Sequence, residues 1–319
     1  MTTDPPPRYP GIAPSPIAFH TMQMRVSTSQ FSREESRQPE LSTVMAPGGL
    51  FGIPSGFGFA FRPIACSPHS MDSPRVPPSP FSTAALRTRV LTPEWMDDPM
   101  LPPELHRKAL RGLGRLHGLS RMGAGIAAAF QPRLTMLPQG ATILDVGTGR
   151  GDLLAEVVAR TNAGLSGHGI DLSHFALSEA KEKWGPKGLK FHLGDCLASE
   201  DPAPVSVDFI MCSLLFHHLE VDQVVGLLSR MNQRARRFVV VADLRRSLLA
   251  WWAVRAGAAL LTRSPVVRVD SDLSVRAAFT MEEVRAMCDR AGIPNASLHR
   301  CGPAGWLLSF EPTGKAAPA

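Results

Sequence analysis

The chain has 319 residues, of which 44% are hydrophobic and 19% are charged, and its formal net charge at pH 7 is +6. This length suits one large domain or two ordinary ones. The positive charge is mostly arginine spread along the chain, and its densest cluster, at residues 230–237, lacks the interleaved aromatic rings that nucleic-acid binding requires. We therefore expect no nucleic-acid partner.

The N-terminal quarter of the chain differs in composition from the rest. About half of the 29 prolines lie before residue 81, among many glycines, serines and phenylalanines and without an apolar period of 2 or 3.6. Such a segment buries too little apolar surface to offset its ordering entropy. We expect residues 1–85 to be a disordered tail, or to lie upstream of the true start because Met71 and Met96 are alternative starts. Residues 86–319 would form one domain.

The sequence shows no sign of secretion or membrane insertion. Its first residues lack the basic and apolar regions of a secretory signal, and its least charged window, residues 41–61, is interrupted by prolines and by five glycines. The five cysteines form no Cys-x-x-Cys pair and no even framework, so we expect reduced thiols, no metal site and a cytoplasmic protein.

Two helices are expected before the first strand. Pro103 stands in the first turn of the first helix, where proline is favoured, and apolar residues follow at helical spacing up to Leu119. A second helix over residues 121–136 leads to the turn Pro138-Gln139-Gly140. We expect this helical cover, about residues 100–136, to lie over the ligand site or a sheet edge.

From Ala141 onward, β-rich runs alternate with helical patterns. The expected strands span residues 142–146, 165–171, 189–193, 207–213 and 237–242, and the expected helices between them span residues 152–160, 173–184 and 221–232. Such alternation is typical of βαβ units and a parallel sheet covered on both faces.

The C-terminal part has a different pattern. An apolar helix over residues 248–261 is followed by an irregular polar segment to Phe279, then by a helix that Thr280 caps and Gly292 closes. Strands at residues 297–301 and 306–310, joined by a short link, suggest an antiparallel pair. The predicted fold is α/β: a Rossmann-like, seven-stranded, mostly parallel sheet with an antiparallel C-terminal strand and helices on both faces. Residues 244–279 would be a substrate-side insertion.

A glycine-rich turn follows the first strand, with glycine at positions 147, 149 and 151 and an acid, Asp145, before it. Glycine allows a sharp turn and close approach of a ligand to the backbone at a helix N-terminus. The dinucleotide fingerprint Gly-x-Gly-x-x-Gly would require glycine at position 152, where Asp152 stands. The third glycine therefore comes one residue too early for that fingerprint.

Acids also follow the second and third strands, and the fourth strand ends in Ser213-Leu214-Leu215-Phe216-His217-His218-Leu219. Together with Asp145, Asp171 and Asp195, this pattern resembles the class I methyltransferases, which bind S-adenosylmethionine. Within that family it resembles the branch typified by ubiquinone and menaquinone biosynthesis methyltransferases. The resemblance covers roughly residues 88–310 and is strongest over 141–219.

The resemblance implies S-adenosylmethionine as the cofactor. The residues expected to hold it are Asp145, Gly147, Thr148, Gly149, Gly151, Asp171, Leu172, Asp195, Cys196 and Ser213. Asp145 would face the positive methionine end, Asp171 the ribose diol, and Asp195 the adenine amino group. Each acid could instead have a structural role: Asp145 would cap the glycine loop, Asp171 would be the N-cap of the next helix, and Asp195 would form a simple turn.

Methyl transfer from a sulfonium needs alignment more than covalent help from the protein. A hydroxyl or carbon acceptor must still lose a proton, and histidine titrates near neutral pH. His217 and His218, after strand four, are candidate bases, and Asp243, at the end of strand five, is a further catalytic candidate. The alternatives are a helix-capping or packing histidine, and an Asp243 paired with Arg245 or Arg246.

The acceptor is expected to be a small, apolar organic molecule, methylated on oxygen or carbon. Trp251 and Trp252, on the apolar helix, would shape its pocket or a lid, or that helix would be a core or dimer-facing element. Peripheral membrane contact stays open. The Asp/Asn-Pro-Pro-Tyr run of many N-methyltransferases does not follow strand four. Two other function classes remain: an NAD-dependent oxidoreductase and a non-catalytic partner protein.

Overall fold

The computed structural model describes residues 86–98, 100–134, 137–198 and 202–313. The prediction for residues 1–85 lies outside this part of the chain. Among the described residues, no helix is both long and apolar enough to cross a membrane.

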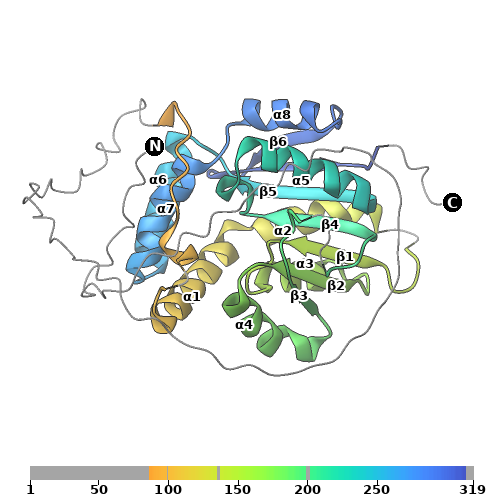
Figure 1. The fold of residues 1–319 in the computed structure, drawn as a ribbon, viewed down its shortest axis with the longest axis horizontal. Helices are drawn as coiled ribbons and strands as arrows, with labels where there is room; N and C mark the ends of the chain where they lie inside the picture. The colour runs from red at the N-terminus through yellow and green to blue at the C-terminus, as the bar shows by residue number, and fades with distance from the viewer. Residues whose placement is uncertain (1–85, 99, 135–136, 199–201, 314–319) are drawn as a thin grey trace, which may run out of the picture. The chain divides into compact units, whose positions relative to one another are not determined.

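The centre of the fold is a seven-stranded sheet with the strand order β3-β2-β1-β4-β5-β7-β6 (Figure 1). Strands β1 to β5 pair in parallel, and β7 runs antiparallel to both β5 and β6. The strands span Thr142–Val146 (β1), Ser166–Asp171 (β2), Lys190–Leu193 (β3), Val207–Ser213 (β4), Ala235–Leu244 (β5), Ser297–Cys301 (β6) and Gly305–Phe310 (β7). The predicted Rossmann-like α/β fold is confirmed.

Alternate strand residues supply two hydrophobic cores, one on each face of the sheet. Ile143 and Phe209 pack with α2 (Met122–Phe130) and α3 (Asp152–Thr161) on one face. Leu144 and Ile210 pack with α5 (Val221–Arg234) and α8 (Met281–Arg290) on the other. This alternation follows from the period of two along a strand, and burial on both faces explains why the strand sequences are continuously apolar. Helix α4 (His174–Trp184) flanks β2 and β3.

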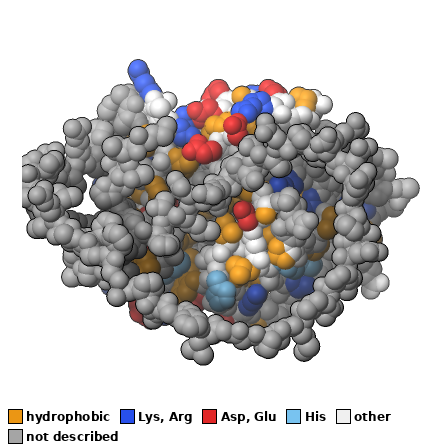
Figure 2. Space-filling view, viewed as in Figure 1, with side chains coloured by type: hydrophobic (Ala, Val, Ile, Leu, Met, Phe, Trp, Pro, Cys, Tyr) orange, Lys and Arg blue, Asp and Glu red, His pale blue; other side chains and the backbone are white. Residues whose placement is uncertain are grey.

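Helix α8 shows how the local sequence sets an element's bounds and its outward face. Thr280 and Glu283 form a reciprocal capping box, with Glu283 N donating to Thr280 Oγ1 at 3.3 Å and Thr280 N donating to Glu283 Oε2 at 2.8 Å. Val284, Met287 and Cys288 face the core. Charged side chains gather on this outer edge of the molecule (Figure 2).

The helical cover before β1 is shorter than predicted. Helix α1 spans Pro103–Ser120, and Arg121, with a φ of 56°, turns the chain into α2. Helix α2 ends at Phe130 and a 3-10 turn, Gln131–Arg133, follows. Because Pro132 lacks an amide hydrogen and its ring clashes with the preceding turn, the α-helix does not continue to residue 136 as predicted.

The prediction of an irregular segment before Phe279 is wrong. Helix α6 (Leu248–Leu261) is followed by a second helix, α7 (Pro265–Ala277), which packs beside it (Figure 1). Proline in the first turn marks the start of α7. Its buried face includes Asp270, Ser271 and Ser274, and the two serine hydroxyls donate to backbone carbonyls one turn earlier. These buried polar residues hide the helical period from an apolar count.

Candidate active site

The turn between β1 and α3 places bare backbone at a helix N-terminus. Gly147, Gly149 and Gly151 have φ values of 71°, 53° and 69°, in the left-handed region that favours glycine. A Cβ at Gly151 would lie 2.6 Å from the Phe191 ring, whereas one at Gly149 would meet nothing within 4 Å. The turn is therefore packed against the protein at Gly151 and open at Gly149.

Asp145 is buried below this turn and only half satisfied. Its Oδ2 accepts a hydrogen bond from Thr148 Oγ1 at 2.8 Å, while its buried Oδ1 has no hydrogen-bond partner in the described part of the chain. Burial raises the pKa of Asp145 to about 7, and the charge of Asp171 adds to this rise against the Thr148 hydrogen bond. An unpaired buried carboxylate oxygen beside open backbone suits a positively charged ligand group.

Asp171, at the end of β2, is tied to the same turn. Its Oδ2 accepts from Gly149 N at 2.7 Å and its Oδ1 from Ser173 N at 2.8 Å. Burial raises the pKa of Asp171, although these backbone hydrogen bonds oppose the rise. Helix α4 is capped instead by Ser173, whose Oγ accepts from Ala176 N. The N-cap alternative for Asp171 is therefore wrong.

The turn after β3 lies next to this strand end, because Gly194 N donates to Asp171 O at 3.0 Å. Asp195 Oδ1 accepts from Leu197 N at 2.8 Å. This hydrogen bond is the one expected if Asp195 forms a simple turn, the alternative to a role in adenine binding. Arg230 of α5 donates to the carbonyls of Cys196 and Leu197 at 3.0 and 2.9 Å and so holds the loop in place. Leu172 is 65% exposed between the two turns. The predicted cofactor residues, with Ser213 at the end of β4, thus lie at or just beyond the carboxyl ends of β1 to β4.

His217 and Asp243 form a buried pair. His217 lies in a 3-10 turn after β4, and its Nδ1 is 2.6 Å from Asp243 Oδ1, while its backbone N donates to Oδ2 at 3.1 Å. Asp243 therefore orients the histidine rather than pairing with an arginine. Arg246 instead binds both carboxylate oxygens of Glu283 on α8, at 2.6 and 3.0 Å.

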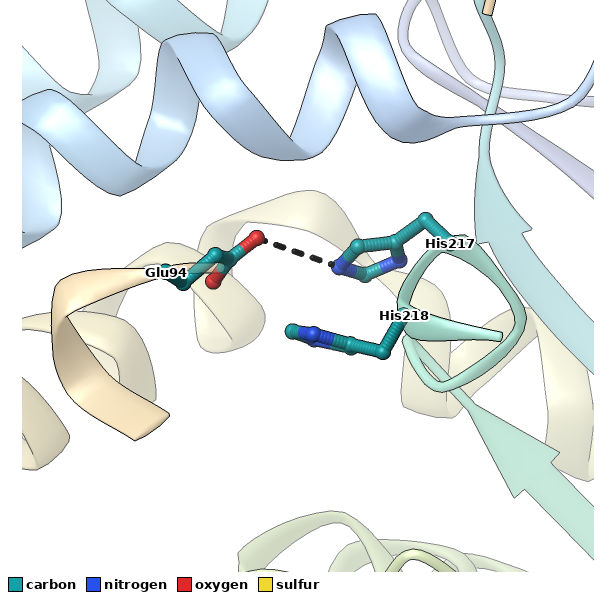
Figure 3. Close-up of side chains that lie close together, drawn as sticks. All are labelled: Glu94, His217 and His218. Atoms are coloured by element: carbon teal, nitrogen blue, oxygen red, sulfur yellow. Dashed lines mark ion pairs between the residues drawn. The ribbon is translucent and has the colours of Figure 1, made fainter. Parts of the chain in front are cut away.

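The segment before α1 brings two acids that the sequence did not predict, Glu94 and Asp97, to these histidines. Figure 3 shows Glu94 beside the two rings. Glu94 Oε1 lies 3.7 Å from His217 Nε2, and Asp97 Oδ2 lies 3.2 Å from His218 Nδ1. Burial opposes a charged His218 ring, but the Asp97 hydrogen bond and the charges of Glu94, Asp97 and Asp243 raise its pKa to about 9. These contacts span more than 120 positions, so no local motif signals them.

Asp270 of α7 holds this segment. Its Oδ1 accepts from Trp95 N at 2.8 Å and its Oδ2 from Met96 N at 3.1 Å. Burial raises the pKa of Asp270 to about 7, with a further contribution from the charge of Glu94. Helix α7, which the sequence did not predict, thus positions the segment that carries Glu94, an acid that the sequence did not predict either.

The histidines lie at the polar end of a cavity of about 340 Å³. Helices α1, α6 and α7 provide its mainly apolar walls, which include Leu113, Leu116, Val254, Leu261 and Val267. The two tryptophans predicted to shape this pocket are not in its lining. Trp251 is buried against Ala250 and Val275, and Trp252 is 50% exposed.

Residues 143–237 match the family described as "Methyltransferase domain". Over this stretch the chain is similar to methyltransferase domains. The match confirms the prediction of a methyltransferase, and with it S-adenosylmethionine as the methyl donor. No curated protein matches the chain. The finer assignment to a ubiquinone-biosynthesis-type branch stays a prediction.

Solved structures share the fold at low sequence identity. The plantazolicin methyltransferase BpumL, in complex with SAH, is 16% identical with a TM-score of 0.50, over 67% of this chain and 91% of that one. Human N-acetylserotonin methyltransferase is 16% identical with a TM-score of 0.46, and 66% of this chain covers 58% of it. A SAM-dependent methyltransferase from Aquifex aeolicus is 19% identical with a TM-score of 0.46, over 67% of this chain and all of that one.

Proposed function

We propose that this chain methylates a hydroxyl group of a small, apolar organic acceptor that binds in the cavity. The observation that carries the proposal is an apolar cavity lined at its polar end by His217, whose ring Asp243 holds. Apolar walls with a few convergent polar groups are typical of small-molecule sites.

The cofactor would bind along the carboxyl ends of β1 to β4. Asp145 suits the cationic methionine end because its Oδ1 is unpaired, and Gly149 leaves open space over the turn. Asp171 and Asp195 would bind the ribose and the adenine, between Leu172 and Cys196. When bound, S-adenosylmethionine supplies a methyl group that a nucleophile can displace from sulfur.

The remaining task is to remove the proton of the acceptor hydroxyl. Nδ1 of His217 is hydrogen-bonded to Asp243, so Nε2 is the ring nitrogen that can accept that proton. The pair is buried, with His217 and Asp243 side chains 5% and 2% exposed, which strengthens the interaction between them. A positioned base of this kind contributes about 10²–10⁴-fold to a rate.

The proposal is tested by incubating the protein with deuterium-labelled S-adenosylmethionine and a panel of apolar phenols and alcohols. Mass spectrometry detects the labelled product, and NMR locates the methylated atom. We expect His217→Asn to lower kcat by about 10²–10⁴-fold while the Kd for S-adenosylmethionine changes little. His299→Asn, at an exposed position on β6, is the matched control.

Two results would overturn this function. One is a labelled methyl group found on nitrogen or carbon in every product. The other is a His217→Asn variant that turns over at the rate of the unchanged chain.

A further inference from the structure

Three side chains at the polar end of the cavity converge as metal ligands do. Glu94, His217 and His218 each offer one donor atom, and these atoms all lie within 4.8 Å of one another. Glu94 comes from the segment before α1, and both histidines come from the turn after β4 (Figure 3). Donors about 2.0–2.2 Å from a zinc ion lie roughly 3–4 Å apart, so small side-chain shifts would suffice to bring them around one ion.

Both imidazole rings are oriented through their Nδ1 atoms. His217 Nδ1 is 2.6 Å from Asp243 and His218 Nδ1 is 3.2 Å from Asp97. A metal-binding histidine typically uses its second nitrogen in this way, because a carboxylate at that position fixes the ring and makes the ligand nitrogen more basic. Nε2 of each ring is then the atom available to an ion.

Glu94 is also held in place by contacts with α7. Its Oε1 accepts a hydrogen bond from Ser274 Oγ on α7, and Asp270 binds the backbone of the next two residues. Its side chain is 10% exposed. The 3.7 Å between Glu94 Oε1 and His217 Nε2 is too long for a hydrogen bond, so these two groups do not satisfy each other directly.

We propose that Glu94, His217 and His218 bind a divalent first-row transition-metal ion such as Zn²⁺, with open coordination positions toward the cavity. Two imidazoles and one carboxylate form the ligand set of catalytic zinc sites and of other transition-metal sites with open positions. Mg²⁺ and Ca²⁺ prefer oxygen ligands and fit this set poorly. Asp97, Asp243 and Asp270, which surround the trio, add negative charge that favours a cation.

The ion gives the polar end a second way to activate the acceptor, and this step rests on the proposed function. A hydroxyl oxygen bound to a divalent ion loses its proton more readily. The O–H bond breaks, the electron pair stays on oxygen, and the proton passes to water. His217 then acts as a ligand rather than as the base, while Asp243 keeps its positioning role.

Metal binding is measured on the full chain, freed of any affinity tag and stripped with a chelator, without an acceptor. Co²⁺ is titrated and its visible absorption recorded, and competition with Zn²⁺ gives the Kd. We expect one ion per chain and a visible absorption spectrum of the kind that Co²⁺ gives at low coordination number. Glu94→Gln and His218→Asn should each weaken binding at least 10–100-fold, and Asp243→Asn about 10–100-fold.

Glu104→Gln and His299→Asn, at exposed positions, are the matched controls and should bind as the unchanged chain does. Thermal unfolding and SAH binding show that each variant has folded. The inference fails if the unchanged chain binds Co²⁺ no more tightly than a Glu94→Gln/His218→Asn double variant. It fails equally if Glu94→Gln and His218→Asn each leave the Kd unaltered. Either failure leaves proton transfer to His217 intact, whereas the proposed function fails only in the methyl-transfer assay.

Discussion

Two buried carboxylates, near the carboxyl ends of β1 and β5, differ in how fully they are hydrogen-bonded. Asp243 binds the ring and the backbone of His217 with its two oxygens. Asp145 leaves Oδ1 unpaired, which is costly for a buried polar atom. The satisfied acid therefore orients a side chain, whereas the unsatisfied one is available to a ligand.

The state of Asp145 makes the affinity for S-adenosylmethionine depend on pH. Because burial raises its pKa to about 7, this carboxyl is largely protonated below neutrality. A cationic ligand favours the ionised form, so the affinity should increase as the pH rises toward 7 and level off above it. Linkage limits the slope to about tenfold in Kd per pH unit.

The measurement is the Kd for S-adenosylmethionine by calorimetry across the range from mildly acidic to mildly basic pH. Asp145→Asn cannot ionise and retains an acceptor for the Thr148 hydroxyl. Any slope that this variant shows belongs to the ligand or to other groups. If the two proteins give parallel profiles, Asp145 does not contact the cationic part of the cofactor.

Among the elements, the turn from β1 to α3 is the one whose conformation its residues dictate most directly. Gly151 is the N-cap of α3 and has a φ of 69°. It also faces the Phe191 ring of β3, so the same glycine sets the backbone turn and the packing of the helix against the sheet.

Replacing Gly151 by alanine should destabilise the fold through both effects. A left-handed residue with a Cβ costs about 1–2 kcal/mol, and the Cβ would lie 2.6 Å from the Phe191 ring, which adds about 1–3 kcal/mol for overpacking. Gly164→Ala is the matched control, because its φ is 64° and nothing lies within 4 Å of its Cβ. Urea unfolding of both variants separates the clash from the backbone cost. Equal losses would contradict the packing role of Gly151.

Helix α7 shows where element prediction failed. Its sequence, Pro-Val-Val-Arg-Val-Asp-Ser-Asp-Leu-Ser, has the start signal of a helix, but Asp270, Ser271 and Ser274 interrupt the apolar residues on its buried face. Those side chains bond to the helix backbone and to the segment that carries Glu94. A count of local hydrophobic periods does not detect polar residues that are buried because their hydrogen-bond partners lie far away in the chain.

At the scale of the molecule, the two halves of the site differ in how far the sequence predicts them. The cofactor half follows the carboxyl ends of successive strands, each with a local signature: the glycine turn, then Asp171, then Asp195. The acceptor half combines the Glu94 segment, α6, α7 and the turn after β4. Its geometry depends on contacts across more than 120 positions, which propensity and spacing do not encode. His217, His218 and Asp243 were predicted because they too lie near the carboxyl ends of strands.

The described part of the chain begins with a segment, residues 86–97, that is bonded to the body of the domain at several points. Arg246 Nε donates to Leu86 O at 3.0 Å. Arg89 donates to the carbonyls of Ala277, His217 and Leu219 and lies over the Phe279 ring at 4.0 Å. Arg89 thus joins this segment to the turn that carries both histidines.

Limited digestion with chymotrypsin should therefore leave a fragment that starts near residue 86 and keeps the Glu94 segment. We expect Arg89→Met to release this segment, so that cleavage advances to Leu91 or Trp95 at protease levels that the unchanged chain withstands. Arg87→Met, at an exposed position two residues away, should behave as the unchanged chain does. Mass spectrometry reads the new N-terminus. Fragments that start beyond residue 97 in the unchanged chain would show that this segment is not a stable part of the domain, and the acceptor site built on Glu94 would then lose its basis.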